Sequence, residues 1–266
     1  MNLEALCTRV CDLARVTGGI IKRDIHKIKK EDLEIKGRHN YVTYVDKMSE
    51  AFLVKELSSI LPEAGFIAEE GTQAKKGGRF QWVIDPLDGT TNYIHALPIY
   101  SISIALMDGD EVVLGVVYEV NQKDCFYAWQ NSPAYLNGKP IQCSRTRILD
   151  DSLLATGFPY TDPGYMENNL RLLGYLLQNS RGMRRLGSAA VDLAYVACGR
   201  FDGFYEYGLN PWDVAAGSLI VRQASGRVSD FKGGSRYIHG KEIIASNPNI
   251  YDHLMDAFRK YFVPNK

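Results

Sequence analysis

The sequence lacks an excess of charge of either sign. Its 31 lysines and arginines balance 31 aspartates and glutamates, so the formal net charge is zero. Without a positive surplus, no overall field attracts a polyanion or an acidic lipid surface. We therefore expect neither a nucleic-acid polymer nor a membrane among the partners of this chain.

Cysteines are few, and long apolar runs are missing. The cysteines are odd in number and scattered, without the paired spacing of a zinc site or a disulfide framework. They occur at Cys7, Cys11, Cys125, Cys143 and Cys198. No apolar run reaches the length that spans a bilayer, and the N-terminal residues intersperse charged with apolar side chains, unlike an export signal. These observations predict a cytoplasmic protein that is neither exported nor membrane-bound.

Internal repeats and low-complexity linkers are also missing, so the 266 residues are expected to form one compact domain over 1–266. Apolar residues at helical spacing predict helices over 3–28, 46–61, 164–178, 188–198, 213–225 and 249–262. Strand-like runs occur at 65–70, 80–85, 100–120 and 124–130, the third with a turn at 108–110. The charged segment 29–43 predicts a solvated loop or a loose hairpin. The pattern indicates an α+β fold of sheets covered by helices, with halves at roughly 1–150 and 151–266.

Two aspartates stand three residues apart in the stretch "WVIDPLDGTTNYIH", residues 82 to 95. Asp85 ends an apolar run, and Pro86 predicts a turn directly after it, so Asp85 is expected where a buried strand opens to solvent. Crowding two buried like charges is costly, which favours a cation between Asp85 and Asp88. The carbonyl of Leu87 lies between them, and magnesium takes carboxylate and carbonyl oxygens. An ordinary turn rich in Asp and Gly is the alternative.

The residues that follow are suited to a phosphate. Gly89, Thr90 and Thr91 precede a possible helical turn, where backbone N–H groups and hydroxyls are available to phosphate oxygens. A cation and a phosphate are therefore able to meet at this turn.

Other acids have similar positions. Glu69 and Glu70 end another apolar run, and alternation along a strand lets only one of them point inward. Asp46 and Asp213 each begin a predicted helix. An acid there serves equally well as an N-terminal cap or as a ligand in a cleft, and both interpretations stay open.

Taken together and in order, these stretches resemble the inositol monophosphatase family of magnesium-dependent, lithium-sensitive phosphomonoesterases. The matching stretches are "VTYVD", "AEEG", "WVIDPLDGTTNY", "GSAAVDLAYVACGRFDGFYE" and "PWDVAAG". The resemblance extends from about residue 3 to residue 262, and "TGFPY" at 156–160 is typical of a bacterial-type member. It implies a layered αβαβα sandwich and a homodimer.

The resemblance also implies a metal centre. Magnesium would be held by Glu69, Asp85, the carbonyl of Leu87, Asp88 and Asp213. Glu69 and Thr90 would position and activate the attacking water, and Asp46 would orient the Thr90 hydroxyl. The ions would neutralise the phosphate and lower the pKa of a bound water.

A substrate-binding set is implied in the same way: Asp88, Gly89, Thr90, Gly187, Ser188, Ala189 and Glu206. The backbone N–H groups of Gly89 and Thr90 would receive the phosphate. Glu206 stands seven residues before Asp213, the spacing at which the family binds sugar-like hydroxyls, and so favours a polyol phosphate. Arg184 and Arg185 lie just upstream of the pocket stretch. The alternatives are approach to the substrate and pairing with surface acids, and we expect the second.

The function that the resemblance implies is hydrolysis of inositol monophosphate, or of a related small polyol or sugar phosphate, by attack of metal-activated water. No arrangement of Ser, Cys or His indicates an activated nucleophile, so a covalent phosphoenzyme is not required. A bisphosphate nucleotidase or a fructose-1,6-bisphosphatase-like activity is the neighbouring alternative. A non-enzymatic regulatory protein on the same fold is the contrasting one.

Overall fold

The computed structural model describes residues 1–27, 34–37, 40–71, 78–158 and 163–262. The α-helices in these ranges are α1 (Leu3–Asp24), α2 (Tyr44–Ile60), α3 (Thr90–Ile94), α4 (Met166–Gln178), α5 (Ala189–Ala197), α6 (Pro211–Gln223) and α7 (Tyr251–Tyr261). Short 3-10 helices cover Ile25–Lys27, Leu149–Asp151 and Pro163–Tyr165. Within the described part of the chain, no helix has the length and hydropathy needed to cross a bilayer.

The strands form two large sheets and one hairpin. The larger sheet has the order β3-β4-β5-β6-β7-β8-β9, with β3 (Gly65–Ala68), β4 (Phe80–Asp88), β5 (Ser101–Asp108), β6 (Glu111–Glu119), β7 (Asp124–Trp129), β8 (Ala134–Leu136) and β9 (Lys139–Ile141). The smaller sheet has the order β11-β10-β12-β14-β13, with β10 (Leu153–Thr156), β11 (Gly182–Arg184), β12 (Gly203–Tyr207), β13 (Arg227–Ser229) and β14 (Glu242–Ser246). β1 (Glu34–Gly37) and β2 (Asn40–Val42) form an antiparallel pair.

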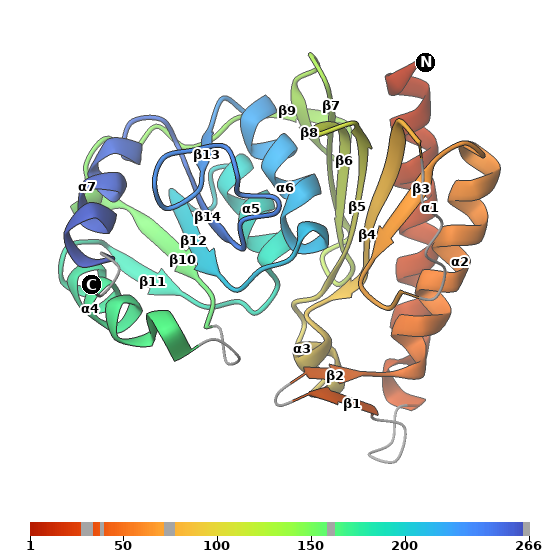
Figure 1. Ribbon diagram of the computed structural model, residues 1–266, viewed down its shortest axis with the longest axis horizontal. Helices are drawn as coiled ribbons and strands as arrows, with labels where there is room; N and C mark the ends of the chain where they lie inside the picture. The colour runs from red at the N-terminus through yellow and green to blue at the C-terminus, as the bar shows by residue number, and fades with distance from the viewer. Residues whose placement is uncertain (28–33, 38–39, 72–77, 159–162, 263–266) are drawn as a thin grey trace.

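Five layers alternate across the molecule (Figure 1). Helices α1 and α2 cover one face of the larger sheet, α5 and α6 lie between the two sheets, and α4 and α7 cover the outer face of the smaller sheet. Both large sheets are mixed: the pairs β3–β4 and β10–β12 are parallel, whereas most neighbouring strands are antiparallel. The layers therefore form an α+β sandwich. The predicted αβαβα layering is thereby confirmed. That the halves fold together as one domain stays a prediction.

Three clusters of buried apolar side chains hold the layers together. The first joins α1 and α2 to the larger sheet and includes Val10, Leu53 and Trp82. The second surrounds α5 and α6, and the third lies beneath α4 and α7. Burying a large apolar side chain contributes about 2 kcal/mol, so these interfaces fix the positions of the helices whose N-terminal ends carry the site.

Most predicted helices and strands are confirmed, with ends that differ by a few residues. The first helix ends at Asp24 rather than at 28 and continues as a 3-10 turn. Of segment 29–43, residues 34–37 and 40–42 form a hairpin, whereas 28–33 and 38–39 lie outside the described residues. A turn at Asn137 and Gly138 joins two short strands, β8 and β9.

The turn predicted at Pro86 is wrong, because β4 continues through Pro86 to Asp88. The pairing of β4 with β5 shifts between Asp85 and Asp88, which makes this a β-bulge. A bulge leaves an extra residue out of the ladder, and proline, which has no N–H to donate, is tolerated at such a place.

Candidate active site

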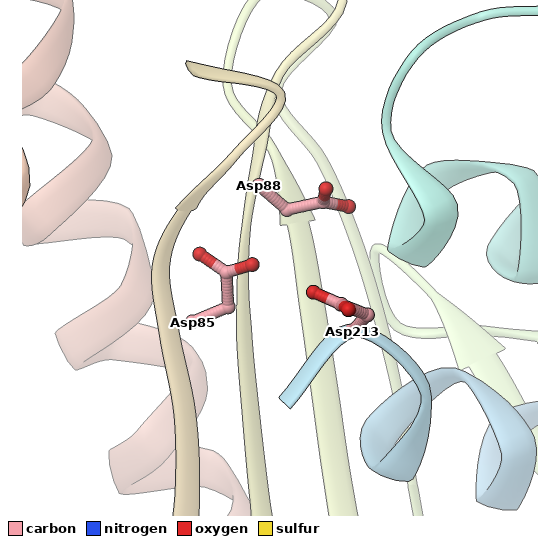
Figure 2. Close-up of side chains that lie close together, drawn as sticks. All are labelled: Asp85, Asp88 and Asp213. Atoms are coloured by element: carbon pink, nitrogen blue, oxygen red, sulfur yellow. The ribbon is translucent and has the colours of Figure 1, made fainter. Parts of the chain in front are cut away.

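Three acidic side chains from two elements of the fold, β4 and α6, meet at one point. One carboxylate oxygen of each of Asp85, Asp88 and Asp213 lies within 4.8 Å of the others. Figure 2 shows the three carboxylates turned toward one another, two from the end of β4 and one from the start of α6. Convergence of residues so far apart in the chain favours the cation-binding interpretation over an ordinary turn.

The bulge in β4 is what brings the first two aspartates together. In a regular strand, residues three positions apart point to opposite faces. Asp85 pairs with Ser103 and Asp88 with Ser101, so three steps along β4 match only two along β5. Ser103 and Ser101 are two residues apart on β5 and so point to the same face of the sheet. The bulge therefore turns the carboxylates of Asp85 and Asp88, which pair with them, to that same face.

Crowding and burial raise the pKa values of these acids. Burial is the main cause at Asp85, whose pKa lies well above its usual range, and the negative charges of nearby acids add to it. Burial also raises the pKa of Asp213, to about 8, with a further increase from the charge of Asp88. For Asp88 burial again raises the pKa, against hydrogen bonds that lower it. A divalent cation would relieve this repulsion, so the cluster has the chemistry of a hard-metal site.

Glu69 lies beside this cluster. The parallel register pairs Ala68 with Ile84, and the backbone N–H of Glu69 donates to the carbonyl of Ile84 at 3.3 Å. Glu69 therefore follows β3 next to Asp85, and its negative charge raises the pKa of Asp85. The neighbouring Glu70 donates its backbone N–H to Oε2 of the buried Glu50 at 2.7 Å. Of the two predicted candidates, Glu69 is the one whose charge acts on Asp85.

Leu87, Thr90 and Asp46 form a chain of hydrogen bonds at the edge of the cluster. The backbone N–H of Leu87 donates to Oδ1 of Asp85 at 2.9 Å. The Thr90 hydroxyl lies 3.1 Å from both Oδ1 of Asp46 and the carbonyl oxygen of Leu87. Since a hydroxyl has one proton, it donates to one of these oxygens at a time. The predicted contact of Asp46 with the Thr90 hydroxyl is present.

Asp46 and Asp213 each cap a helix and also face the site. Oδ2 of Asp46 accepts hydrogen bonds from the backbone N–H and the hydroxyl of Thr43, at 2.8 and 2.6 Å, in a capping box. Oδ2 of Asp213 accepts the backbone N–H of Asn210 at 2.7 Å. The other oxygen of Asp46 is the one that meets Thr90. The two interpretations that the sequence left open are therefore compatible, because a carboxylate has two oxygens.

Ser188 holds Asp88 in place. Its hydroxyl donates to Oδ2 of Asp88 at 2.6 Å, and the backbone N–H of Ala190 donates to the same oxygen at 2.8 Å. The hydroxyls of Ser101 and Ser188 lie 3.1 Å apart. Because Ser188 gives its only proton to Asp88, Ser101 is the donor in this pair. The structure thus gives Ser188 a positioning contact, while its contact with a substrate stays a prediction.

Two glycine turns bring the predicted phosphate and pocket segments together. Gly89 has φ of +99°, and a Cβ there would lie 3.0 Å from the carbonyl oxygen of Ile99 and 3.2 Å from that of Gly187. Gly187 has φ of +90°. Both positions favour glycine, for backbone conformation and for space, since a Cβ at Gly187 would meet the side chains of Arg185 and Asn92. Asn92 bridges the same region, donating from Nδ2 to the carbonyls of Ile99 and Leu186 at 2.7 and 2.8 Å.

Glu206 lies on β12, the strand that pairs with β10. Burial raises the pKa of its carboxyl to about 8, the positive charge of Arg185 lowers it, and the charge of Asp88 raises it further. Arg185 also lowers the pKa of Asp88. Its guanidinium therefore acts on the acids of the site, which differs from the surface pairing expected from the sequence.

Asp192 on α5 is a site neighbour that the sequence interpretation did not single out. Its side chain is buried, and its Oδ1 has no hydrogen-bond partner among the described residues. Burial raises its pKa well above the usual range, and the charges of Glu206 and Asp88 raise it further. The sequence did contain a signal for this residue. Asp192 is the one acid in an otherwise apolar helical run, and it follows Ser188 by four residues, so both lie on the same face of the helix.

Several known proteins resemble this chain in sequence and in fold. The chain is 41% identical over 256 residues to the protein named Nus factor SuhB of Escherichia coli K12, covering 93% of this chain and 96% of that protein. It is 36% identical over 261 residues to the inositol-1-monophosphatase of Mesorhizobium japonicum, covering 98% of each. The crystal structure of the extragenic suppressor protein suhB of Bartonella henselae matches with a TM-score of 0.92 at 37% identity, covering 96% of this chain and 99% of the other. The sequence model described as inositol monophosphatase family matches residues 2–262, and the chain belongs to that family.

Proposed function

We propose that this protein is a Mg²⁺-dependent phosphomonoesterase that hydrolyses inositol monophosphate or a related small polyol phosphate. The observation that carries the proposal is the meeting of Asp85, Asp88 and Asp213 within 4.8 Å. Family membership and the 36% identity to a protein named inositol-1-monophosphatase support it. The carboxyl groups of Asp85, Asp88 and Asp213, whose pKa values are raised, and the nearby carbonyl of Leu87 match the preference of magnesium for oxygen ligands.

The residues that would hold magnesium are Glu69, Asp85, the carbonyl of Leu87, Asp88 and Asp213. Three of these already share one small volume, and the charge of a fourth, Glu69, acts on Asp85. When bound, magnesium supplies positive charge to phosphate oxygens and lowers the pKa of water.

The hydroxyl of Thr90 is arranged to orient the attacking water. Because it donates its proton to Asp46 or to the Leu87 carbonyl, its lone pairs are directed to accept a hydrogen bond. Glu69 is the adjacent carboxylate that would take the proton from that water. Asp46 acts through Thr90 and is itself fixed by Thr43, so it serves as a positioning residue.

Neighbouring segments would receive the phosphate and the alcohol. Gly89 and Thr90 begin α3, where the first backbone N–H groups of a helix have no partner within it and suit phosphate oxygens. Segment 187–189 and Glu206 would form the alcohol side of the pocket.

The direct test is release of phosphate from a panel of phosphate monoesters, with titrated Mg²⁺ and with EDTA. We expect Mg²⁺-dependent release, fastest with inositol 1-phosphate or another polyol monophosphate. Faster release from fructose 1,6-bisphosphate or a nucleoside 3′,5′-bisphosphate would move the chain to the neighbouring substrate class. No release from any ester at any Mg²⁺ concentration contradicts the proposal.

Glu206 offers a sharper test of the alcohol side. We expect Glu206→Ala to raise KM for inositol 1-phosphate about tenfold, because a carboxylate that accepts hydroxyl protons is lost, and to leave KM for an aryl phosphate nearly unchanged. Steady-state kinetics with both substrates measure the difference. Equal changes for the two substrates would remove Glu206 from recognition of the alcohol.

A regulatory role is the second candidate, and the names of relatives favour it. Proteins 41% identical to this chain over 93% of its length are named Nus factor SuhB, a name that refers to no hydrolase. A protein with only such a role would bind its partner equally well with and without the carboxylates of the site. The phosphate-release assay separates it from an enzyme.

Lithium sensitivity, a cytoplasmic location and a homodimer stay predictions. Helix α4 supports the dimer, since Met166, Leu170 and Leu177 are large apolar side chains exposed on it, a surface that a second copy would cover.

A further inference from the structure

Gly157 directly follows β10 and lies against the side chain of Glu206 on β12. Strands β10 and β12 are parallel, and their register pairs Thr156 with Tyr205. Gly157 and Glu206 are the next residues after this last pair. A Cβ on residue 157 would fall on the Glu206 carboxylate, so any side chain at 157 would compete with Glu206 for one space.

The backbone does not explain why this residue is glycine. Eight described glycines have positive φ, but Gly157 is not among them, so its conformation is open to other residues. What excludes a side chain is the carboxylate of Glu206. A Cβ on residue 157 would overlap Cδ and both carboxylate oxygens of Glu206.

We propose that Gly157 is a specificity-determining residue: the missing side chain leaves the space in which the Glu206 carboxylate lies, and so sets where the alcohol part of the substrate is bound. This inference rests on the proposed function, in which Glu206 accepts the substrate hydroxyls. Gly157 itself would act through Glu206, as a positioning residue.

The overlap would be relieved by moving Glu206 rather than by disturbing the fold. The overlapping atoms are the far end of a flexible side chain, which has other staggered rotamers. Displacing the carboxylate by even about one ångström is enough to weaken a hydrogen bond to a substrate hydroxyl.

The test compares Gly157→Ala, Glu206→Ala and the double variant in the Mg²⁺-loaded enzyme. We expect Gly157→Ala to raise KM for inositol 1-phosphate about tenfold with little change for p-nitrophenyl phosphate. The double variant should match Glu206→Ala alone, because the added methyl has nothing left to displace. In the Gly157→Ala background, Glu206→Asp should recover part of the loss, since the shorter side chain withdraws from the methyl.

Gly174→Ala is the matched control. Gly174 lies in α4 with no atom within 4 Å of an added Cβ, so the same substitution there should leave both KM values unchanged. Unchanged KM values in Gly157→Ala, or equal increases for both substrates, would overturn the inference.

Two further measurements keep failure of the inference distinct from failure of the proposed function. A crystal structure of Gly157→Ala should show the Glu206 carboxylate in a new position, whether or not the protein hydrolyses any ester. If Gly157→Ala unfolds, the double variant should fold again, because removing the carboxylate removes the overlap. A carboxylate that stays in place, or a double variant that also fails to fold, counts against the role of Gly157, whereas absent turnover in the unaltered protein counts against the function alone.

Discussion

Asp88→Asn is expected to lower kcat/KM for inositol 1-phosphate by about a thousandfold or more while the protein stays folded. The substitution removes one negative charge from the three-aspartate cluster and so weakens binding of the cation that the proposed chemistry requires. The fold should survive because an asparagine oxygen can still accept the Ser188 hydroxyl and the Ala190 N–H. Steady-state phosphate release at several Mg²⁺ concentrations measures the loss.

The control for this variant is Asp150→Asn, which removes the same charge from an exposed position in Leu149–Asp151. It should leave turnover unchanged. Near-normal phosphate release by Asp88→Asn at low Mg²⁺ would falsify the assigned role of Asp88.

Metal-free protein is expected to lose stability as the pH rises from about 4 to about 8. The pKa of Asp213 is raised from 3.8 to about 8 in the folded state, mainly by burial, and the pKa values of Asp85 and Asp88 are raised as well. Below pH 3.8 these acids are protonated in both the folded and the unfolded state. Above pH 3.8 the unfolded chain releases protons that the folded state retains. The free energy of unfolding therefore falls until the pH passes the folded-state pKa. The loss is on the order of a few kcal/mol, a large part of a typical total of about 5–15 kcal/mol.

Thermal unfolding at pH 5 and pH 8, with EDTA and with Mg²⁺, measures this effect. Mg²⁺ should raise Tm more at pH 8 than at pH 5, because protons compete with the cation for the same oxygens. Asp213→Asn should be more stable than the unaltered protein in EDTA at pH 8 and should gain less from Mg²⁺. If Mg²⁺ stabilises that variant as much as the unaltered protein, Asp213 is not part of the cation site.

The elements of this fold were largely predictable because their signals are local. Apolar periodicity located α1, α2, α4, α5, α6 and α7 and the central strands of the larger sheet. Helix ends were less accurate, as at Asp24, where the last turn tightens into a 3-10 helix. The prediction at Pro86 was wrong for a physical reason. Proline lacks a backbone N–H and so occurs both in turns and in β-bulges, and which of the two forms depends on pairing with the neighbouring strand β5.

The residues of the candidate site that lie in recognisable motifs were predictable from the sequence. Those whose role depends on tertiary packing were not. Asp85, Asp88 and Asp213 lie in motifs that resemble the family's, and the structure brings them together. Roles that depend on which side chains the fold brings together were missed, even within quoted stretches such as "TGFPY". The closeness of Gly157 to the Glu206 carboxylate and the action of the Arg185 charge on Asp88 and Glu206 are set by tertiary packing, which no local pattern encodes.

Each carboxylate of the cluster has one oxygen already fixed by a backbone N–H: Leu87 for Asp85, Ala190 for Asp88 and Asn210 for Asp213. The torsional freedom of these side chains is consequently given up when the chain folds, not when an ion arrives. A cation site whose carboxylates are fixed in this way would discriminate by ionic radius, since Ca²⁺ prefers oxygens at about 2.3–2.6 Å and Mg²⁺ at about 2.0–2.1 Å.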